Sequence, residues 1–483
     1  MVATLALTAA GVAAFPGVSQ AAGSLPCDAY ASGGTPCVAA HSTTRALFAS
    51  YNAPLYQVRR WSDNATTNIG PLATGGYANA AAQDAFCSGT SCTITVIYDQ
   101  TSRHNDLTTA PGGGANSNAD FGANASALPV TAGGHKVYGV YVSAGVGYRD
   151  NSTSGIATGS QPEGMYMVTE GTHYNDRCCF DYGNAETNNL DTGNGHMDAI
   201  NFGTECWFAC AGGSGPWVQA DLENGLFSGG NGSWSPNTGR ATPFVTAALK
   251  NNGSTAYAIK DGDAQSGTLA TRYNGALPTQ AGYAPMHKEG AIILGIGGDN
   301  SNGSVGSFFE GAMTAGFPTD ATEASVQANI VGVAYAKPSS FPVNGSTYRL
   351  TNVNNGKVLD AVNCGVANGT AVDTWQALGN TCQQWRFSSA PRGTWTLTNV
   401  NAGTVLDAQN CGQANGTVAQ LWASLGNRCQ QWAVIPAGGN RYELVVENSG
   451  MVLDAQNCGG ANGTKVQLWP WLDNNCQEWS IAP

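Results

Sequence analysis

The fold of the C-terminal part is decided by VLDAVNCGVANGTAVDTW at residues 358–375, which returns as VLDAQNCGQANGTVAQLW at 405–422 and as VLDAQNCGGANGTKVQLW at 452–469. Each copy runs on to a Cys-Gln-x-Trp ending, and the matched positions recur after 47 residues. A register kept without one insertion indicates three copies of a single unit that share one core. We therefore predict that residues 346–483 form one domain of three 47-residue repeats.

Each repeat carries a pair of side chains suited to holding a sugar. An aspartate is followed fifteen residues later by a tryptophan, so a carboxylate can bind hydroxyl groups while a ring packs on the apolar face of the sugar. Each repeat also contains Ala-Asn-Gly-Thr, whose Asn-Gly pair is typical of a tight turn. The pairs are Asp360 with Trp375, Asp407 with Trp422, and Asp454 with Trp469.

Length and composition predict a larger domain before the repeats. A chain of 483 residues exceeds what one core usually accommodates. With 64 glycines and 11% charged residues, the chain favours short strands and turns over long helices. The repeats carry eight acids against seven bases, so most of the net charge of -12 lies before residue 345. This acidity argues against nucleic acid or an anionic membrane as a partner and suits a neutral substrate.

The first residues, MVATLALTAAGVAAFPGVSQAAG, resemble the apolar core and cleavage site of a signal peptide. The basic residue expected at the start of such a segment is absent, so we expect a truncated start. The alternative is a buried N-terminal helix. No other stretch is long and apolar enough to span a bilayer. We predict a signal peptide at 1–22 and a secreted, extracellular protein.

The cysteines fit an exported protein, because there are fourteen, an even number. A zinc site would need Cys and His clustered at ligand spacing, whereas the six histidines are scattered, so no metal and no cofactor is expected. Local spacing and the repeat period predict seven disulfides. They are Cys27–Cys37, Cys87–Cys92, Cys178–Cys179, Cys206–Cys210, Cys364–Cys382, Cys411–Cys429 and Cys458–Cys476.

Residues 23–336 show frequent strand-like stretches separated by Gly-, Asn- and Ser-rich turns, a pattern that predicts a large all-β sandwich. Helical periodicity is brief and predicts helices at 40–51 and 322–329. The segment 337–345, with two prolines and small polar residues, is predicted to be the linker. The predicted strands include 93–99, 136–143, 216–222, 244–250 and 291–298.

Three settings in this domain could support chemistry on a sugar polymer. Asp221 and Glu223 lie two apart in a predicted strand, on one face, where glycoside hydrolysis could use a carboxyl pair; the alternative is a solvated strand face. Asp299 follows an apolar strand among glycines, and the alternatives are a plain turn or a calcium loop. Cys178 and Cys179 are adjacent, and a bridge between them would form a rigid apolar platform; the alternative is pairing elsewhere.

These settings fall within long stretches that resemble the α-L-arabinofuranosidases of glycoside hydrolase family 54. The resemblance implies a concanavalin-type β-sandwich and a retaining double displacement, with Glu223 as nucleophile and Asp299 as general acid/base. It also implies sugar contacts from Asp221, Asn224, Gly298 and the Cys178–Cys179 disulfide. The family's stacking tryptophan corresponds to Phe208, with Trp207 beside it, so either ring could face the sugar. The matching stretches are LPCD (25–28), VAAHSTTR (38–45), THYNDRCCFDYGNAE (172–186), DLEN (221–224) and KEGAIILGIGGDNSNG (288–303).

The repeats resemble the ricin-type β-trefoil lectins, carbohydrate-binding module family 13, which implies that Trp385, Trp432 and Trp479 are core. The trefoil pattern has an asparagine before the Gln of Gln-x-Trp, where this chain has cysteine. It also has a glutamine two residues before the binding tryptophan, where the first repeat has Asp373. Besides the three aspartate–tryptophan pairs, the predicted sugar-binding residues are Asn380, Gln383, Gln420, Asn427, Gln430, Gln467, Asn474 and Gln477.

Together these features predict an exo-glycosidase that releases terminal α-L-arabinofuranosyl residues from arabinan or arabinoxylan. Its partner would be an arabinose-containing plant cell-wall polysaccharide, gripped by the trefoil, and a monomer is expected. One alternative is a β-xylosidase-type exo-glycosidase on the same fold. The other is a non-catalytic two-domain lectin. Familiar fungal members of the family carry a different C-terminal module, so the resemblance does not imply the trefoil's ligand.

Overall fold

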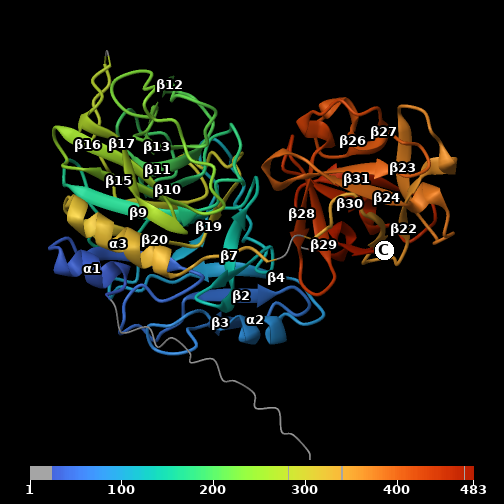
Figure 1. Cartoon of the computed structure of the whole chain (residues 1–483), viewed down its shortest axis with the longest axis horizontal. Coiled ribbons are helices and arrows are strands. Elements are labelled where there is room, and N and C mark those ends of the chain that lie inside the picture. The colour runs from blue at the N-terminus through green and yellow to red at the C-terminus, as the bar shows by residue number, and fades with distance from the viewer. Residues whose placement is uncertain (1–23, 281, 339–340, 473) are drawn as a thin grey trace, which may run out of the picture.

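The computed structural model describes residues 24–280, 282–338, 341–472 and 474–483, and for Phe208 and Ala209 it describes the backbone alone. The predicted signal peptide lies outside these residues, as do positions 339 and 340 of the predicted linker. Two bodies stand side by side, a larger one coloured blue to yellow and a smaller one in orange and red (Figure 1). No helix in the described ranges is long and apolar enough to cross a membrane.

The larger body is a sandwich of a six-stranded and an eleven-stranded sheet, joined by a small three-stranded sheet. The six-stranded sheet has the order β1 (Cys37–Ser42), β20 (Glu310–Ala315), β9 (Glu163–Thr169), β15 (Val245–Asn251), β16 (Ala256–Asp263), β17 (Ser266–Ala276). The eleven-stranded sheet has the order β12 (Phe208–Ala209), β14 (Leu226–Phe227), β13 (Trp217–Asp221), β11 (Asp198–Gly203), β10 (Asp181–Ala185), β18 (Ala291–Leu294), β8 (Tyr148–Asp150), β5 (Leu107–Thr109), β4 (Cys92–Ile97), β2 (Tyr56–Arg60), β3 (Thr66–Ile69). The small sheet is β19 (Gly306–Phe308), β7 (His135–Val142), β6 (Leu128–Ala132).

The central strands are buried on both faces because each face is covered. Every residue of β9, β10, β11, β13 and β15 is buried. Small and apolar residues form most of β15 and β18, whereas β10, β11 and β13 also carry buried aspartate, asparagine or glutamine side chains. The described residues form three α-helices, all at the margins of the sandwich: α1 (Pro26–Ser32), α2 (Ala80–Phe86) and α3 (Asp320–Gly332). The all-β prediction is confirmed, and α3 contains the helix predicted at 322–329.

The helix predicted at 40–51 is wrong. Residues up to Ser42 belong to β1, which pairs with β20, and the chain then turns. The Ser42 hydroxyl accepts hydrogen bonds from the N–H groups of Thr44 and Arg45, an arrangement that competes with a helix. Arg45 is buried against Glu310, with 2.5 Å between Nε and Oε2. Pairing with a distant strand and a buried ion pair therefore override the local helical periodicity.

The smaller body is a β-trefoil of three four-stranded repeats, as predicted. At its centre, Trp385, Trp432 and Trp479 are fully buried. Their indole N–H groups donate to the carbonyl oxygens of Leu359, Leu406 and Leu453, at 3.0, 3.1 and 2.9 Å. The strands are β21 (Thr347–Asn352), β22 (Val358–Ala361), β23 (Thr370–Trp375), β24 (Trp385–Ser389), β25 (Trp395–Asn399), β26 (Val405–Ala408), β27 (Thr417–Trp422), β28 (Trp432–Pro436), β29 (Tyr442–Val446), β30 (Val452–Ala455), β31 (Thr464–Trp469) and β32 (Trp479–Ala482).

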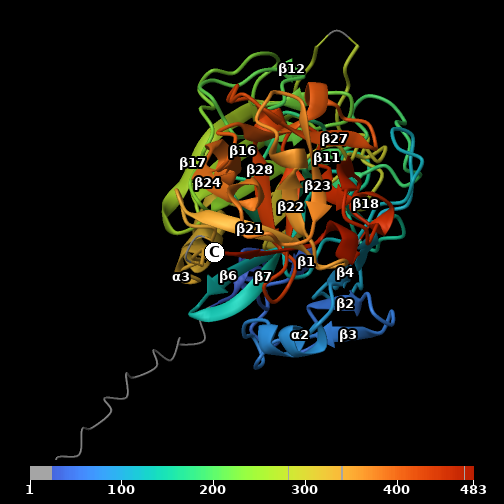
Figure 2. The same cartoon turned by 90° about the vertical axis from the view of Figure 1, so that its right-hand side faces the viewer.

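The two bodies touch through a mixed interface. Ala127 of the sandwich packs with Ile435, Val445 and Trp471 of the trefoil in a buried apolar cluster. At the edge of the contact, Arg428 forms an ion pair with Asp176, 2.6 Å between Nη1 and Oδ1. In the view turned by 90°, the trefoil strands lie in front of the sandwich (Figure 2). This contact holds the trefoil repeats beside the larger domain.

All fourteen cysteines form disulfides, and the bonded pairs are the seven derived from the sequence. The three repeat disulfides share one geometry, with Cα atoms 5.1 to 5.2 Å apart. Each joins the loop after the first strand of its hairpin to the turn before the core tryptophan. The period of 47 residues is therefore kept in the cross-links as well as in the strands.

Candidate active site

The topology of the large sheet places several acidic side chains at one edge. β11 pairs antiparallel with both β10 and β13, so β10 and β13 run parallel and end on the same side. Glu186 follows the end of β10 and Glu223 follows the end of β13 by two residues. The loop after β18 then folds back over the sheet, since Gly295 N–H donates to the Asp181 carbonyl at 2.7 Å. This loop brings Asp299 to the same place.

Glu223 lies in a tight turn held by three groups. β13 ends at Asp221, so the prediction that Asp221 and Glu223 share a strand face is wrong. Glu223 and Asn224 both have positive φ, 67° and 53°, a conformation that costs non-glycine residues about 1 kcal/mol or more each. The Asp221 carboxylate accepts the Glu223 N–H at 3.0 Å, and the Tyr283 hydroxyl lies 2.9 Å from the Glu223 carbonyl. The Asn224 amide donates to Asp191 at 2.9 Å.

Asp299 is held by the loop that carries it. Its Oδ1 accepts hydrogen bonds from the backbone N–H and the hydroxyl of Ser301, at 3.0 and 2.6 Å. The preceding Gly298 packs so closely on Glu186 that a Cβ would lie 1.8 Å from the Glu186 Oε2. Only glycine fits there. The side chain of Asn302 donates to Asp120 at 2.6 Å, so this amide is engaged away from Asp299, which weakens the calcium-loop alternative.

The Cys178–Cys179 disulfide forms one wall of the site. The Cys179 sulfur lies 3.8 Å from Oδ2 of Asp221, a packing contact because a disulfide sulfur has no proton to donate. These two cysteines and Asp221 lie close enough to share a metal ion, but sulfurs joined in a disulfide offer no thiolate ligand. The wall is therefore apolar, and its contact with a sugar stays a prediction.

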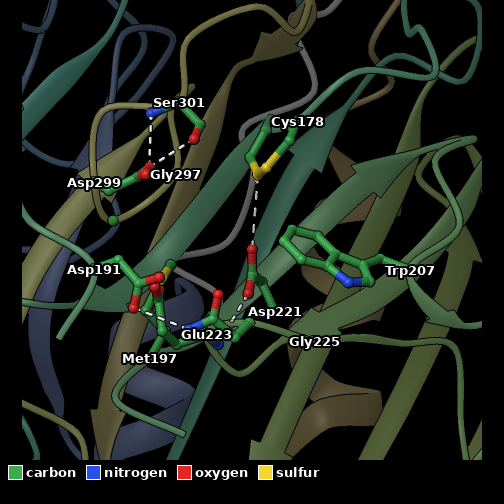
Figure 3. A pocket seen from close by; sticks show the side chains of 13 residues that line it. Cys178, Asp191, Met197, Trp207, Asp221, Glu223, Gly225, Gly297, Asp299 and Ser301 are labelled. Carbon is green, nitrogen blue, oxygen red and sulfur yellow. Dashed lines mark hydrogen bonds between the residues drawn. A yellow bond between two sulfur atoms is a disulfide. The ribbon is translucent and has the colours of Figure 1, made fainter. Parts of the chain in front are cut away.

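These groups enclose a cavity of about 130 Å³. In Figure 3, Asp299 lies on one side, Glu223 and Asp221 at the base, and Trp207 and the disulfide on the other side. Trp207 is 49% exposed and lines the opening. The prediction for Phe208 concerns a side chain outside the described part of the structure. The lining residues are Cys178, Cys179, Asp191, Met197, Trp207, Asp221, Glu223, Asn224, Gly225, Gly297, Gly298, Asp299 and Ser301.

Burial and crowding of acids shift the proton affinities of the site. Burial, with neighbouring Glu186 and Asp299, raises the pKa of Asp221 to about 7. Burial and contact with Glu186 raise the pKa of Glu223 to about 12. The site has one buried cation, Arg149, and burial lowers its pKa to about 10. An acidic cluster with this little compensation keeps at least one proton at neutral pH.

The trefoil repeats bring together the predicted sugar-binding residues. Oδ1 and Oδ2 of Asp407 accept hydrogen bonds from the amides of Gln420 and Gln430, at 2.9 and 3.0 Å. Asp454 accepts from Gln467 at 2.9 Å in the same way. Trp422 and Trp469 are half-buried at the ends of their strands. Gln430 also accepts from the Leu425 N–H and donates to the Ala423 carbonyl, so it fixes the loop after Trp422.

The first repeat differs, because Asp373 replaces the glutamine. Asp373 stands directly opposite Asp360 in the β22–β23 pairing, and its Oδ1 is buried without a hydrogen-bond partner in the described structure. Burial and the negative charge of Asp360 raise the pKa of Asp373 to about 6. The predicted asparagines differ too: Asn427 and Asn474 accept the backbone N–H two residues ahead, whereas Asn380 donates weakly to the Cys364 sulfur.

The family model described as "Alpha-L-arabinofuranosidase B, catalytic" matches residues 26–336, and one described as "Ricin-type beta-trefoil lectin domain-like" matches 339–422 and 428–483. The chain belongs to the α-L-arabinofuranosidase B family. It is 60% identical over 323 residues to a probable α-L-arabinofuranosidase B of Aspergillus fumigatus, covering 65% of this chain and 63% of that protein. It is 61% identical over 327 residues to an α-L-arabinofuranosidase of Hypocrea jecorina, covering 65% of each. The chain thus spans just under two thirds of these relatives.

Solved structures of this family resemble the whole architecture. A GH54 α-L-arabinofuranosidase soaked with a cyclic sulfate inhibitor has a TM-score of 0.81 and 39% identity, covering 95% of this chain and 99% of that one. An arabinofuranosidase complexed with arabinofuranosyl-α-1,2-xylobiose has a TM-score of 0.80 and 39% identity, covering 95% and 98%. The curated relatives match two thirds of this chain, whereas the structural match extends through the trefoil.

Sequence reasoning missed four residues that lie at or beside the pocket of this chain. Glu186 and Arg149 carry no local signal, since they reach the site through strand pairing. Tyr283 and Asp191 act on the Glu223 turn from separate loops. Glu186 ends the stretch 172–186, one of the stretches that carry the family resemblance. Its partner Glu223 lies 37 positions farther along the chain. Only the fold shows that the two are neighbours.

Proposed function

We propose that the chain is a secreted, retaining exo-glycosidase that releases terminal α-L-arabinofuranosyl residues from arabinan or arabinoxylan side chains. The observation that carries the proposal is the small pocket where Glu223, Asp221 and Asp299 meet beside the Cys178–Cys179 wall. A cavity of about 130 Å³ fits one sugar at a chain end rather than a polymer passing through. Membership of the α-L-arabinofuranosidase B family and the likeness to an enzyme complexed with an arabinofuranosyl-xylobiose support arabinose as that sugar.

In the proposed reaction, Glu223 attacks the anomeric carbon while Asp299 protonates the leaving oxygen. A covalent arabinosyl-enzyme forms, and Asp299 then takes a proton from water, which attacks the same carbon and frees Glu223. Retention by this route requires the two carboxyl groups to lie ~5–5.5 Å apart. Asp221 anchors the Glu223 backbone through Oδ1, while its Oδ2 lies beside the Cys179 sulfur, and we propose that this carboxyl also contacts a sugar hydroxyl. The disulfide wall excludes water beside the ring.

The trefoil is proposed to anchor the enzyme to polysaccharide. Three sites on one rigid domain raise the effective concentration of enzyme at a polymer surface, even where each site binds weakly. In this arrangement residues 1–22 direct secretion, 23–336 carry the catalysis, 337–345 link the domains and 346–483 bind sugar. The acidic, charge-poor surface suits a neutral polymer, and the enzyme is proposed to act as a monomer without a cofactor.

Product analysis tests the proposed activity. The intact protein should release free L-arabinose, and no oligosaccharides, from arabinan or arabinoxylan. Removing residues 345–483 should lower release from insoluble polymer several-fold but leave the rate on a soluble aryl α-L-arabinofuranoside unchanged, because avidity matters only on a surface. Absence of arabinose release from either polymer and from the aryl glycoside would favour the non-catalytic lectin.

A second candidate is β-xylosidase activity at the same pocket. A Trichoderma koningii protein named "Arabinofuranosidase/B-xylosidase" is 61% identical over 327 residues. The two activities are distinguished by side-by-side rates on aryl α-L-arabinofuranoside and aryl β-D-xyloside. We expect the arabinofuranoside to be hydrolysed faster, and a higher rate on the xyloside would reverse the assignment.

The three trefoil sites are predicted to be unequal, with repeats two and three binding better than the first at neutral pH. Above pH 6 the Asp360–Asp373 pair carries two charges, whereas below pH 6 a protonated Asp373 can donate to Asp360 as Gln420 does to Asp407. First-repeat binding should therefore rise as pH falls through 6. The measurement is polysaccharide pull-down of a protein carrying Trp422→Ala and Trp469→Ala, which isolates the first site.

The control for this pH effect is Asp373→Gln in the same background. The variant should bind several-fold better at pH 7 and lose the pH dependence, since its amide donates at every pH. Trp375→Ala, beside Trp422→Ala and Trp469→Ala singly, ranks the three sites. Equal losses from the three tryptophan variants at pH 7 would contradict the ranking.

A further inference from the structure

Glu186 is a further carboxyl group beside the pocket, and the proposed reaction does not use it. Its side chain is fully buried under Gly298 and lies within hydrogen-bonding reach of the Glu223 carboxyl. Both carboxyl oxygens of Glu186 are buried, and among the described residues no donor group hydrogen-bonds to either of them. The Glu223 carboxyl is the side chain placed to share a proton with it. A buried carboxyl whose one side-chain partner is another carboxyl needs a proton between them.

The surrounding residues fix Glu186 in place without neutralising it. Arg149 donates to the carbonyl oxygens of Glu186 and Gly298, rather than to the Glu186 carboxyl. The Glu223 backbone is held by Asp221 and Tyr283, but the orientation of its carboxyl is left to Glu186. A hydrogen bond between the two carboxyls would occupy one oxygen of Glu223 and leave the other for the cavity.

We propose that Glu186 is a positioning residue, which shares one proton with Glu223 and directs the Glu223 carboxylate at the anomeric carbon. This inference rests on the proposed function. In the competent state the proton resides on Glu186, which donates to one oxygen of ionised Glu223 and leaves the other to attack. The pair keeps this proton at neutral pH because burial and mutual repulsion raise the pKa of its second ionisation.

Protons balance through the cycle. When the bond between Glu223 and the anomeric carbon forms, the bond to the leaving oxygen breaks and Asp299 gives up its proton. The shared proton stays on Glu186 and bonds the carbonyl oxygen of the new ester. When water attacks, Asp299 regains a proton, the ester bond breaks, and Glu223 leaves as a carboxylate that again accepts from Glu186. Glu186 is therefore never the acid or the base of either step.

The experiment compares Glu186→Gln with Glu186→Met on an aryl α-L-arabinofuranoside, following kcat and the pH profile of kcat/KM. Gln keeps a donor toward Glu223, so kcat should stay within about tenfold of the wild type. The acid limb, the low-pH side of the kcat/KM profile, should stay at the same pH. Met fills the same space without a donor. It should lower kcat about 100-fold and move the acid limb up by about one pH unit or more. That limb reports the first ionisation of the Glu186–Glu223 pair, which the shared proton makes easier, whereas a lone buried Glu223 lacks a donor for its charge.

Further variants separate positioning from structure. Glu186→Asp keeps the carboxyl group but places it one methylene farther from Glu223, so it should move the acid limb in the same direction as Glu186→Met. It replaces the Met variant in the test if that variant does not fold. Glu163→Gln removes another buried carboxylate, paired with Lys288 in the opposite sheet, and should leave the limb unmoved. The inference about Glu186 would be overturned, with the proposed function intact, by an unshifted acid limb in both Glu186→Met and Glu186→Asp. Equal shifts in Glu186→Gln and Glu186→Met would overturn it in the same way. An inactive wild type would overturn the proposed function, and this inference with it.

Discussion

Glu223→Ala is expected to lower kcat on an aryl α-L-arabinofuranoside by on the order of 10⁴-fold or more, because the covalent intermediate can no longer form. The site itself should survive. Asp221 and Tyr283 hold the turn through the Glu223 backbone, which alanine retains. Alanine should also relieve the crowding with Glu186, so the thermal midpoint should be unchanged or raised. Initial rates and thermal unfolding of the purified variant provide the measurement.

Azide gives this variant a specific readout. A small anion in the space left by the Glu223 side chain can attack the anomeric carbon from the same side, giving β-L-arabinofuranosyl azide, the anomer opposite to the substrate. Rescue of this kind identifies the missing residue as a nucleophile. Loss of a residue with only a structural role would not be rescued by azide with this stereochemistry. Asp63→Asn, an exposed acid far from the pocket, is the matched control and should retain full activity. Full activity in Glu223→Ala would exclude Glu223 as the nucleophile.

The trefoil could be predicted from the sequence because the residues that define each repeat lie close together in the chain and the pattern occurs three times. Asp407, Gln420 and Trp422 occupy one hairpin, so a period of 47 residues places the corresponding groups of every repeat. The departure at Asp373 was visible too, since it interrupts the pattern. Its physical consequence was not, because the facing Asp360 and the burial of the pair come from strand register.

The sandwich was predictable in class and less so in detail. The wrong helix at 40–51 shows why. Its apolar and polar residues fit a helical period, but residues 40–42 pair with β20, which lies 270 residues later in the chain. The same non-local pairing assembles the pocket. Glu223 and Asp299 were proposed through family resemblance, whereas Glu186, Arg149 and Tyr283 needed the parallel course of β10 and β13 before they could be connected with Glu223. Long-range topology is the part that local patterns do not encode.

Asp299→Ala should produce a loss that depends on the leaving group. On arabinan or arabinoxylan, where the departing sugar hydroxyl needs a proton, the rate should fall ~10²–10⁴-fold, the usual contribution of a general acid. On a dinitrophenyl arabinofuranoside, whose phenolate departs unaided, formation of the arabinosyl-enzyme should be nearly as fast as in the wild type. Hydrolysis of that intermediate would then limit turnover, because no base activates water. A burst of phenolate followed by a slow steady state is the expected time course.

Azide again separates the roles, now with the opposite stereochemistry. In Asp299→Ala it should attack the arabinosyl-enzyme from the side that water normally uses, restoring turnover and giving α-L-arabinofuranosyl azide. Ser301→Ala removes the hydroxyl that donates to Asp299 at 2.6 Å but keeps the backbone donor, so its effect should be much smaller and independent of the leaving group. If Asp299→Ala lowers the rate equally for good and poor leaving groups, Asp299 would be assigned to sugar binding instead. The general acid would then be one of the other carboxyl groups lining the pocket. The pair of azide products therefore tests the proposed division of labour between Glu223 and Asp299 more sharply than either loss of rate alone.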